Sequence, residues 1–149
     1  MTTMQSTGPR ILVGVDGSEP SGLALQWGAF LAAPLGATVD AIIAWQLPVT
    51  YGWTAPQWDP RTEMAEILNE SVHSLFGERP PVPIHTHVRE GGAARVLVEA
   101  SRDAHILIVG SRGHGGFVGL LLGSVSASVA EHAACPVLVV HGDQGPPGA

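Results

Sequence analysis

The chain contains no lysine, and this absence excludes two kinds of chemistry. All seven basic residues among its 149 are arginines. A Walker A loop needs a lysine that reaches the phosphates of the nucleotide, and a Schiff-base enzyme needs a lysine as its nucleophile. The sequence therefore excludes both a P-loop nucleotidase and a Schiff-base enzyme.

Cysteine is almost as scarce. Cys135 is the only cysteine in the chain, so neither an internal disulfide nor a cysteine-rich zinc site can form. A reducing compartment is the simpler inference from this composition. We expect Cys135, which precedes Pro136, to be a small buried apolar residue.

Charge and long apolar runs are also limited. Charged residues make up 13% of the chain and hydrophobic residues 45%, which is typical of a compact globular protein. The net charge of −6 disfavours nonspecific binding to nucleic acid, and no apolar run approaches the roughly 18 residues of a membrane span. No secretory signal pattern opens the sequence. We therefore expect one cytoplasmic domain over residues 1–149, with flexible ends at 1–9 and 142–149.

A spaced glycine pattern near the C-terminus carries the main functional signal. Gly110, Gly113 and Gly123-Ser124 stand as G-x2-G-x9-G-S, between an apolar run and a helix-like segment. Glycines after a strand let the backbone turn sharply and approach a ligand closely. Ser124, Ser126 and the free N–H groups of a helix start are suited to phosphate oxygens. The pattern predicts a site for a nucleotide or another phosphate-bearing ligand.

Apolar, β-branched runs alternate with helical patterns along the chain. They predict strands over 10–16, 38–45, 84–89, 105–110 and 136–141, and helices from Ser18 or Ser21 to about 34, from 60 to about 76, over 93–101 and over 124–133. This order predicts a parallel sheet covered by helices on both faces. If the strands ending at Asp16 and Gly110 are neighbours, their loops meet across one ligand crevice.

The chain resembles the universal stress protein family in three segments. These are the opening ILVGVDGSEPS, the spaced glycine signature and the closing SVAEHAACPVLVV, within a resemblance that covers residues 9–141. It implies a three-layer α/β/α sandwich with a five-stranded parallel sheet, of the adenine nucleotide alpha hydrolase-like class. It also implies a homodimer formed through the C-terminal strand 136–141. The complete glycine signature implies the ATP-binding branch of the family.

The resemblance also implies which residues contact ATP. By their place in the motifs these are Gly14, Val15, Asp16, Ala44, Gly110, Gly113, His114, Gly115, Gly123, Ser124, Val125 and Ser126. Gly14, Val15 and Ala44 would lie near the base, Asp16 near the ribose or a bound Mg²⁺, and residues 123–126 at the phosphates. Arg112 has a guanidinium suited to phosphate; an arginine that only faces solvent is the alternative.

Three functions follow from these observations. The first is a nucleotide-dependent regulator of a stress response that binds ATP and acts on a partner that the sequence does not identify. The second is slow ATP hydrolysis or nucleotidyl transfer, with Asp16 holding Mg²⁺ and Arg112 or His114 assisting; a single arginine and no clear base disfavour it. The third is an interaction protein that binds no nucleotide and uses the Trp-rich loop 46–59.

One further pattern concerns metal binding. His85 and His87 alternate onto one face of a predicted strand, which would suit a metal ion. No third ligand stands at a useful spacing. Partly buried, hydrogen-bonded histidines are therefore the preferred interpretation.

Overall fold

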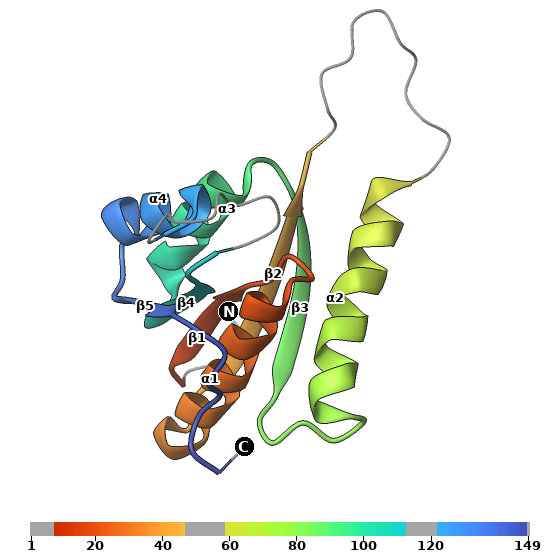
Figure 1. The fold of residues 1–149 in the computed structure, drawn as a ribbon, viewed down its shortest axis with the longest axis vertical. Coiled ribbons are helices and arrows are strands. Elements are labelled where there is room, and N and C mark those ends of the chain that lie inside the picture. The colour runs from red at the N-terminus through yellow and green to blue at the C-terminus, as the bar shows by residue number, and fades with distance from the viewer. Residues whose placement is uncertain (1–7, 47–58, 113–121, 149) are drawn as a thin grey trace, which may run out of the picture.

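Helices cover both faces of a five-stranded parallel sheet (Figure 1). The computed structural model describes residues 8–46, 59–112 and 122–148. Its strands are β1 (Arg10–Gly14), β2 (Thr38–Trp45), β3 (Ile84–Glu90), β4 (Ile106–Gly110) and β5 (Val137–Val140). Their spatial order is β3-β2-β1-β4-β5, and every neighbouring pair is parallel. The predicted parallel sheet is confirmed.

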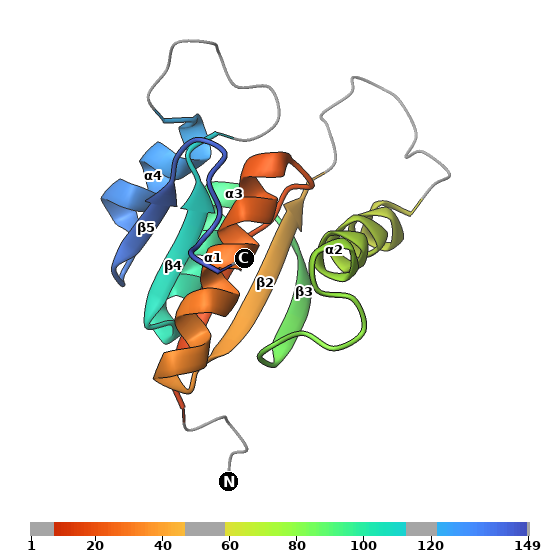
Figure 2. The ribbon, with the colours of Figure 1, turned by 60° about the horizontal axis from the view of Figure 1, so that its bottom comes forward.

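Two helices lie on each face of the sheet. They are α1 (Glu19–Leu35), α2 (Pro60–Phe76), α3 (Ala93–Ala100) and α4 (Ser124–His132), with a short 3-10 turn, η1 (Ser101–Asp103), after α3. α1 and α2 pack on one face, and α3 and α4 on the other (Figure 2). This is the predicted three-layer sandwich. None of the helices in the described ranges has the length and apolar character needed to cross a bilayer.

The helix starts follow capping residues that are visible in the sequence. Ser18 caps α1, and Asp59 caps α2 by accepting hydrogen bonds from Arg61 N (3.1 Å) and from the Thr62 hydroxyl (2.8 Å). The bond from Thr62 leads the interactions that hold the pKa of Asp59 below its ordinary value. α1 ends at Gly36, whose φ of 65° is left-handed, a conformation that glycine adopts without strain.

The first strand is shorter than the predicted segment 10–16. β1 ends at Gly14, although Val15 N still donates to Ile42 O at 2.9 Å. Asp16 then leaves the sheet because its carboxylate accepts hydrogen bonds from the backbone N–H and the hydroxyl of Ser18. This local turn is the kind that aspartate favours, and it starts α1.

The C-terminal segment described by the structure contacts α1. The indole Nε1 of Trp27 donates to the backbone oxygen of Gln144 at 3.4 Å, and Pro146 is buried. Figure 2 shows this segment passing alongside α1. Residues 142–148, expected to be a flexible end, therefore include contacts with the helix layer.

Each face of the sheet has its own apolar core. Leu25, Leu68 and Ile108 are fully buried on the side of α1 and α2, and Leu107 and Val129 are fully buried on the other side. Strands that are covered on both faces read as nearly continuous apolar runs. That explains why the sequence shows runs of β-branched residues where a half-exposed sheet would show alternation.

A buried carboxylate interrupts the apolar sequence of β2. Asp40 is 5% exposed, and its two oxygens accept hydrogen bonds from Arg10 Nε (2.8 Å) and His87 Nε2 (3.0 Å). These partners lie on the two strands that flank β2, so the network links β1, β2 and β3 laterally. Burial by itself raises the pKa of Asp40, but the bonds from His87 and Arg10 outweigh burial and hold the pKa below its ordinary value.

Gly110, the first glycine of the signature, lies against the first turn of α1. A Cβ at this position would lie 2.7 Å from the Cβ of Pro20 and 2.9 Å from its carbonyl carbon and oxygen. Backbone atoms of a helix cannot move aside as the end of a side chain can. Glycine at this position therefore allows α1 to approach the carboxyl end of β4.

We expect Asp40→Asn to lower the free energy of unfolding by about 1–3 kcal/mol at pH 7, because a buried, hydrogen-bonded charge is removed. The folded-state pKa of Asp40 is depressed, so its stabilisation is present above the unfolded-state pKa of about 3.9 and is lost as pH falls through the folded-state value. Urea unfolding should be measured at several pH values from 7 to 3. The difference in free energy of unfolding between wild type and Asp40→Asn should become smaller as the pH falls. Asp103→Asn, at an exposed carboxylate, is the control. A difference that stays constant down to pH 3 would contradict the assignment.

Two glycine-to-alanine substitutions should change stability in opposite directions. Gly110→Ala should lower the free energy of unfolding by about 1–3 kcal/mol through overpacking against Pro20. Gly22→Ala lies inside α1, where an added Cβ would meet Leu75 Cδ1 at an ordinary contact distance of 3.9 Å. It should raise the free energy of unfolding by about 0.5–1 kcal/mol through helix propensity. Urea unfolding of both variants tests whether Gly110 is packed tightly against Pro20. Equal effects of the same sign would show that the packing at Gly110 is not tight.

Candidate functional site

The carboxyl ends of β1 and β4 lie side by side where the chain reverses its order across the sheet. β1 pairs with β4 through Ile11↔Ile106 and Val13↔Ile108. From β1 the chain moves to β2 on one side, whereas from β4 it moves to β5 on the other. Ligands of open parallel sheets bind in the crevice at such a switch point. The pairing of β1 with β4 meets the condition under which the loops after these strands lie beside one another.

The structure places most of the predicted site residues at this edge. Gly14, Val15 and Asp16 end β1 or follow it, Ala44 lies near the end of β2, Gly110 and Arg112 end β4 or follow it, and Gly123, Ser124, Val125 and Ser126 form the start of α4. Gly113, His114 and Gly115 lie outside the described residues, as does most of the Trp-rich loop 46–59. The described residues therefore come from three strand ends and one helix N-terminus.

The Ser111 carbonyl oxygen joins the two ends of the glycine segment. It accepts a hydrogen bond from Gly123 N at 2.6 Å and another from the Ser126 hydroxyl at 2.9 Å. Ser111 N donates to Val140 O at 2.8 Å, so β5 is attached at the same point. These bonds hold the start of α4 against the ends of β4 and β5. Ser111 could not be recognised from the sequence, because its role depends on its backbone N–H and carbonyl groups and not on its side chain.

The Ser126 hydroxyl is already used in hydrogen bonding to the backbone at the start of α4. It is 3% exposed, and its hydroxyl lies within hydrogen-bond distance of the carbonyl oxygens of Ser111 (2.9 Å) and Gly123 (3.1 Å). A serine hydroxyl has one proton to donate. Any contact of Ser126 with a phosphate would therefore use its backbone N–H.

Within the residues that the structure describes, the first backbone N–H groups of α4 have no hydrogen-bond partner. Its N-cap residue, Gly123, supplies no side-chain hydrogen bond, and the first N–H groups of a helix have no partner within the helix. They form the positive end of the helix dipole. The Ser124 side chain is exposed beside them. This arrangement is chemically suited to an oxyanion.

Asp16 stands at the carboxyl end of β1 in a fixed orientation. Its carboxylate accepts a hydrogen bond from Ser18 N at 2.9 Å, and its own N–H donates to the Ser21 hydroxyl at 3.3 Å. The residue is exposed. It therefore serves the turn into α1, and it leaves an exposed acidic residue directly after β1.

Metal-ligating residues are sparse in the ranges that the structure describes. Within them no group of three His, Cys, Asp or Glu side chains is arranged to hold a metal ion. His87 is hydrogen-bonded to Asp40, while His85 is exposed. Cys135 is half-buried rather than fully buried, and burial raises the pKa of its thiol. A Mg²⁺ ion held by Asp16 would need further oxygens from a ligand, as is usual for this ion with phosphates.

The Asp40 network was missed by the sequence reasoning. Asp40 interrupts the apolar segment TVDAIIAW, and buried carboxylates are rare unless they are paired. That interruption was the available signal. The identity of the partners, Arg10 and His87, follows only from the strand order.

Comparison with known proteins agrees with this architecture. The model of the universal stress protein family matches residues 9–141. A universal stress protein of Mycolicibacterium smegmatis is 36% identical over 146 residues, which cover 89% of this chain and 48% of that protein. The chain spans about half the length of the curated relatives it matches.

Two solved structures share the fold. A universal stress protein in complex with cAMP has a TM-score of 0.65 and 28% identity, over 91% of this chain and 98% of that chain. A universal stress protein family protein of Arabidopsis thaliana with AMP bound has a TM-score of 0.60 and 19% identity, over 94% and 97% of the two chains. The second likeness supports the fold alone. The match over residues 9–141 shows that this chain belongs to the universal stress protein family.

Proposed function

We propose that the chain binds an adenine nucleotide, with ATP as the leading candidate, in the crevice between the carboxyl ends of β1 and β4. The observation that carries the proposal is the uncapped N-terminus of α4, which the Ser111 carbonyl holds beside the end of β4. The cAMP complex of a family member that is 28% identical supports an adenine nucleotide as the ligand class.

The proposed contacts divide along the nucleotide. The backbones of Gly14, Val15 and Ala44 would contact the base, since the Val15 side chain is buried. Asp16 would contact the ribose or a bound Mg²⁺. The phosphates would lie against the start of α4, with Ser124 and the N–H groups of residues 124–126 as donors and Arg112 as the counter-charge. Gly110, Gly113, His114 and Gly115 would flank the ribose and phosphates.

The proposed role is regulation of a stress response by nucleotide occupancy. A ligand that binds one conformation more tightly shifts the population toward it, and a partner would recognise that state in the cytoplasm. The chain offers one arginine and no lysine in the signature, whereas efficient phosphoryl transfer needs stronger charge neutralisation. β5 lies at one edge of the sheet, and we propose that segment 136–141 pairs there with a second copy.

Protein denatured directly after purification should release an adenine nucleotide, identified by mass spectrometry. The protein freed of nucleotide should then bind ATP saturably. Tryptophan fluorescence measures this binding in titrations with and without Mg²⁺. Phosphate release measured in the same samples separates binding from hydrolysis. Absence of a released nucleotide together with absence of saturable ATP binding would overturn the proposal and favour the Trp-rich loop as the functional surface.

Two serine variants separate ligand binding from folding. Ser124→Ala should weaken ATP binding about tenfold, as expected for a hydrogen bond to a charged group, and should change the free energy of unfolding by less than about 0.5 kcal/mol. Ser126→Ala should lower the free energy of unfolding by about 1–2 kcal/mol, because it removes the buried hydrogen bond that the Ser126 hydroxyl makes to backbone carbonyl oxygen. Calorimetric titration with ATP and urea unfolding measure the two effects. An unchanged ATP affinity in Ser124→Ala would show that the Ser124 side chain does not contact the nucleotide.

A further inference from the structure

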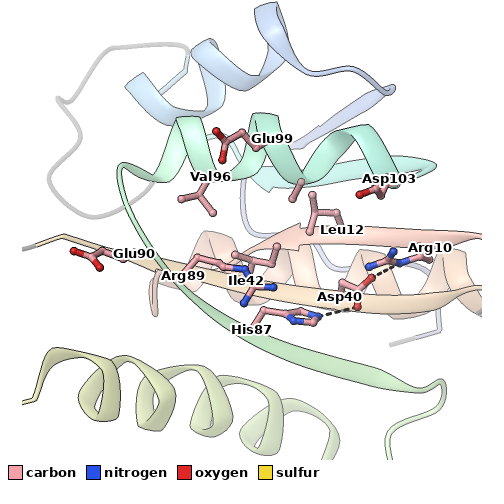
Figure 3. A pocket seen from close by; sticks show the side chains of 12 residues that line it. Arg10, Leu12, Asp40, Ile42, His87, Arg89, Glu90, Val96, Glu99 and Asp103 are labelled. Carbon is pink, nitrogen blue, oxygen red and sulfur yellow. Dashed lines mark hydrogen bonds and ion pairs between the residues drawn. The ribbon is translucent and has the colours of Figure 1, made fainter. Parts of the chain in front are cut away.

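The two sides of the sheet differ in how their outer side chains are satisfied. On the α3 side, Figure 3 shows Asp40 between Arg10 and His87 in a hollow of about 310 Å³, hydrogen-bonded to both. These polar groups therefore use one another. On the opposite side, α1 carries an apolar stripe that reaches the surface of the molecule. None of the proposed nucleotide contacts belongs to that stripe.

α1 is apolar well beyond the side that packs on the sheet. Its inner side is buried in the core. A second apolar stripe lies beside the inner side at helical spacing and consists of Leu23, Trp27, Phe30 and Leu31. We call it the Trp27 stripe. No charged residue occurs from position 20 to position 35. A helix that is apolar over so much of its surface is typically covered by other parts of a protein.

The C-terminal segment 142–148 contacts the Trp27 stripe. The indole Nε1 of Trp27 donates a hydrogen bond to the backbone oxygen of Gln144 at 3.4 Å. Two residues further on, Pro146 is buried, whereas Pro147 is exposed. Figure 2 shows the segment running alongside α1. A side-chain donor on the helix and a buried proline of the segment therefore accompany this contact.

A second aromatic ring supports Trp27 and extends the apolar surface. Phe30 contacts Trp27 edge to face, with ring centroids 5.8 Å apart and an interplanar angle of 84°, an arrangement that aromatic pairs favour. Phe30 is nevertheless 40% exposed, and Leu35 at the end of α1 is 59% exposed. The C-terminal segment therefore leaves part of the apolar surface of α1 uncovered, and a longer segment would bury more of it.

These groups match the chemistry by which proteins recognise proline-rich segments. Such segments are extended and have no internal hydrogen bonds, and they bind in grooves lined by aromatic side chains. Their backbone oxygens stay available as acceptors, and an indole N–H can only donate. The bond from Trp27 to Gln144 and the burial of Pro146 combine both features within this chain. The uncharged surface of α1 suits the same kind of segment.

We propose that the Trp27 stripe is a docking site for an extended proline-rich segment of a partner protein, and that residues 144–147 occupy the site until the partner displaces them. The partner would place a backbone oxygen at Trp27 Nε1 and a proline ring at the position of Pro146. Its further apolar residues would cover Phe30. Because the C-terminal segment is joined to β5 through His141, its effective concentration at the site is high, and the partner must compete with it.

NMR titration of the full chain with a synthetic peptide of the sequence 142–148 tests the proposal. In a Pro146→Ala chain, whose own segment is held less firmly, the peptide should shift the indole N–H of Trp27 and the amides of residues 23–31 saturably. It should bind this chain about tenfold more tightly than wild type. Pro147→Ala, at the exposed proline, is the matched control and should behave as wild type. Absence of a saturable shift in the Pro146→Ala chain would overturn the proposal.

Substituted peptides test whether proline is recognised. A peptide with alanine in place of the first proline should bind the Pro146→Ala chain about tenfold more weakly, because a buried ring is lost. A peptide with alanine in place of the second proline should bind as the original does. Equal affinities of the two substituted peptides would show that the site does not select a proline and would reject it.

Two tryptophan variants locate the site on α1. Trp27→Phe keeps an aromatic ring and removes the indole donor, so it should weaken peptide binding to the Pro146→Ala chain about fivefold. Trp45→Phe removes an indole N–H that has no hydrogen-bond partner among the described residues, and it should leave the affinity unchanged. The amides of residues 23–31 report binding in both variants, and thermal unfolding checks that each is folded. Equal effects of the two substitutions would reject Trp27 as the donor.

Discussion

A parallel sheet that is covered on both faces forces the chain to reverse direction across it, and the proposed nucleotide site lies at that reversal. Right-handed crossovers place α1 and α2 on one face as the chain moves from β1 to β3. The other face is covered only because the chain returns to the far side of β1 and builds β4 and β5 there. The loops after β1 and β4 then diverge. The position of the proposed site is thus a consequence of how the fold buries its apolar strands.

The glycine signature contains residues that serve folding and residues that the proposed nucleotide site would use. Gly110 is packed against Pro20, and the Ser126 hydroxyl is bonded to backbone carbonyls. Both residues therefore have structural reasons for their identity. Ser124 and the N–H groups at the start of α4 remain as the parts that can face a ligand. A spaced motif of this kind is informative because its members position one another: the residues that pack the crevice determine where the binding donors stand.

Local signals made the architecture predictable from the sequence. The Asp59-Pro60 pair marks the start of α2, and the segment Thr38–Trp45 coincides with β2. The order of strands and helices then gave the layered sheet. The turn at Asp16 shortened β1 because a side-chain hydrogen bond to Ser18 competes with the ladder, and a local pattern of apolar residues does not record that competition.

Contacts between distant parts of the chain could not be predicted in the same way. Gly110 and Pro20 meet only because α1 crosses the end of β4. A carboxylate in an apolar strand indicates that Asp40 is paired. Its partners, Arg10 and His87, cannot be identified without knowing which strands flank β2. Ser111 acts through its backbone, so its side chain carries no signal. These features follow from topology, and composition or periodicity alone cannot reveal them.

The dimensions of helices and strands also explain why the sheet keeps one accessible basic face. A helix is about 10 Å wide, whereas strands are about 4.8 Å apart, so two helices cover roughly four strands. On the side where α3 packs against β1 and β2 and α4 against β5, the strand left over is β3. A strand face without a helix must be polar, and Arg89 and His87 meet that requirement. Asp40 binds His87 on one side and Arg10 on the other, so this polar strand face is linked to the centre of the sheet by side-chain hydrogen bonds.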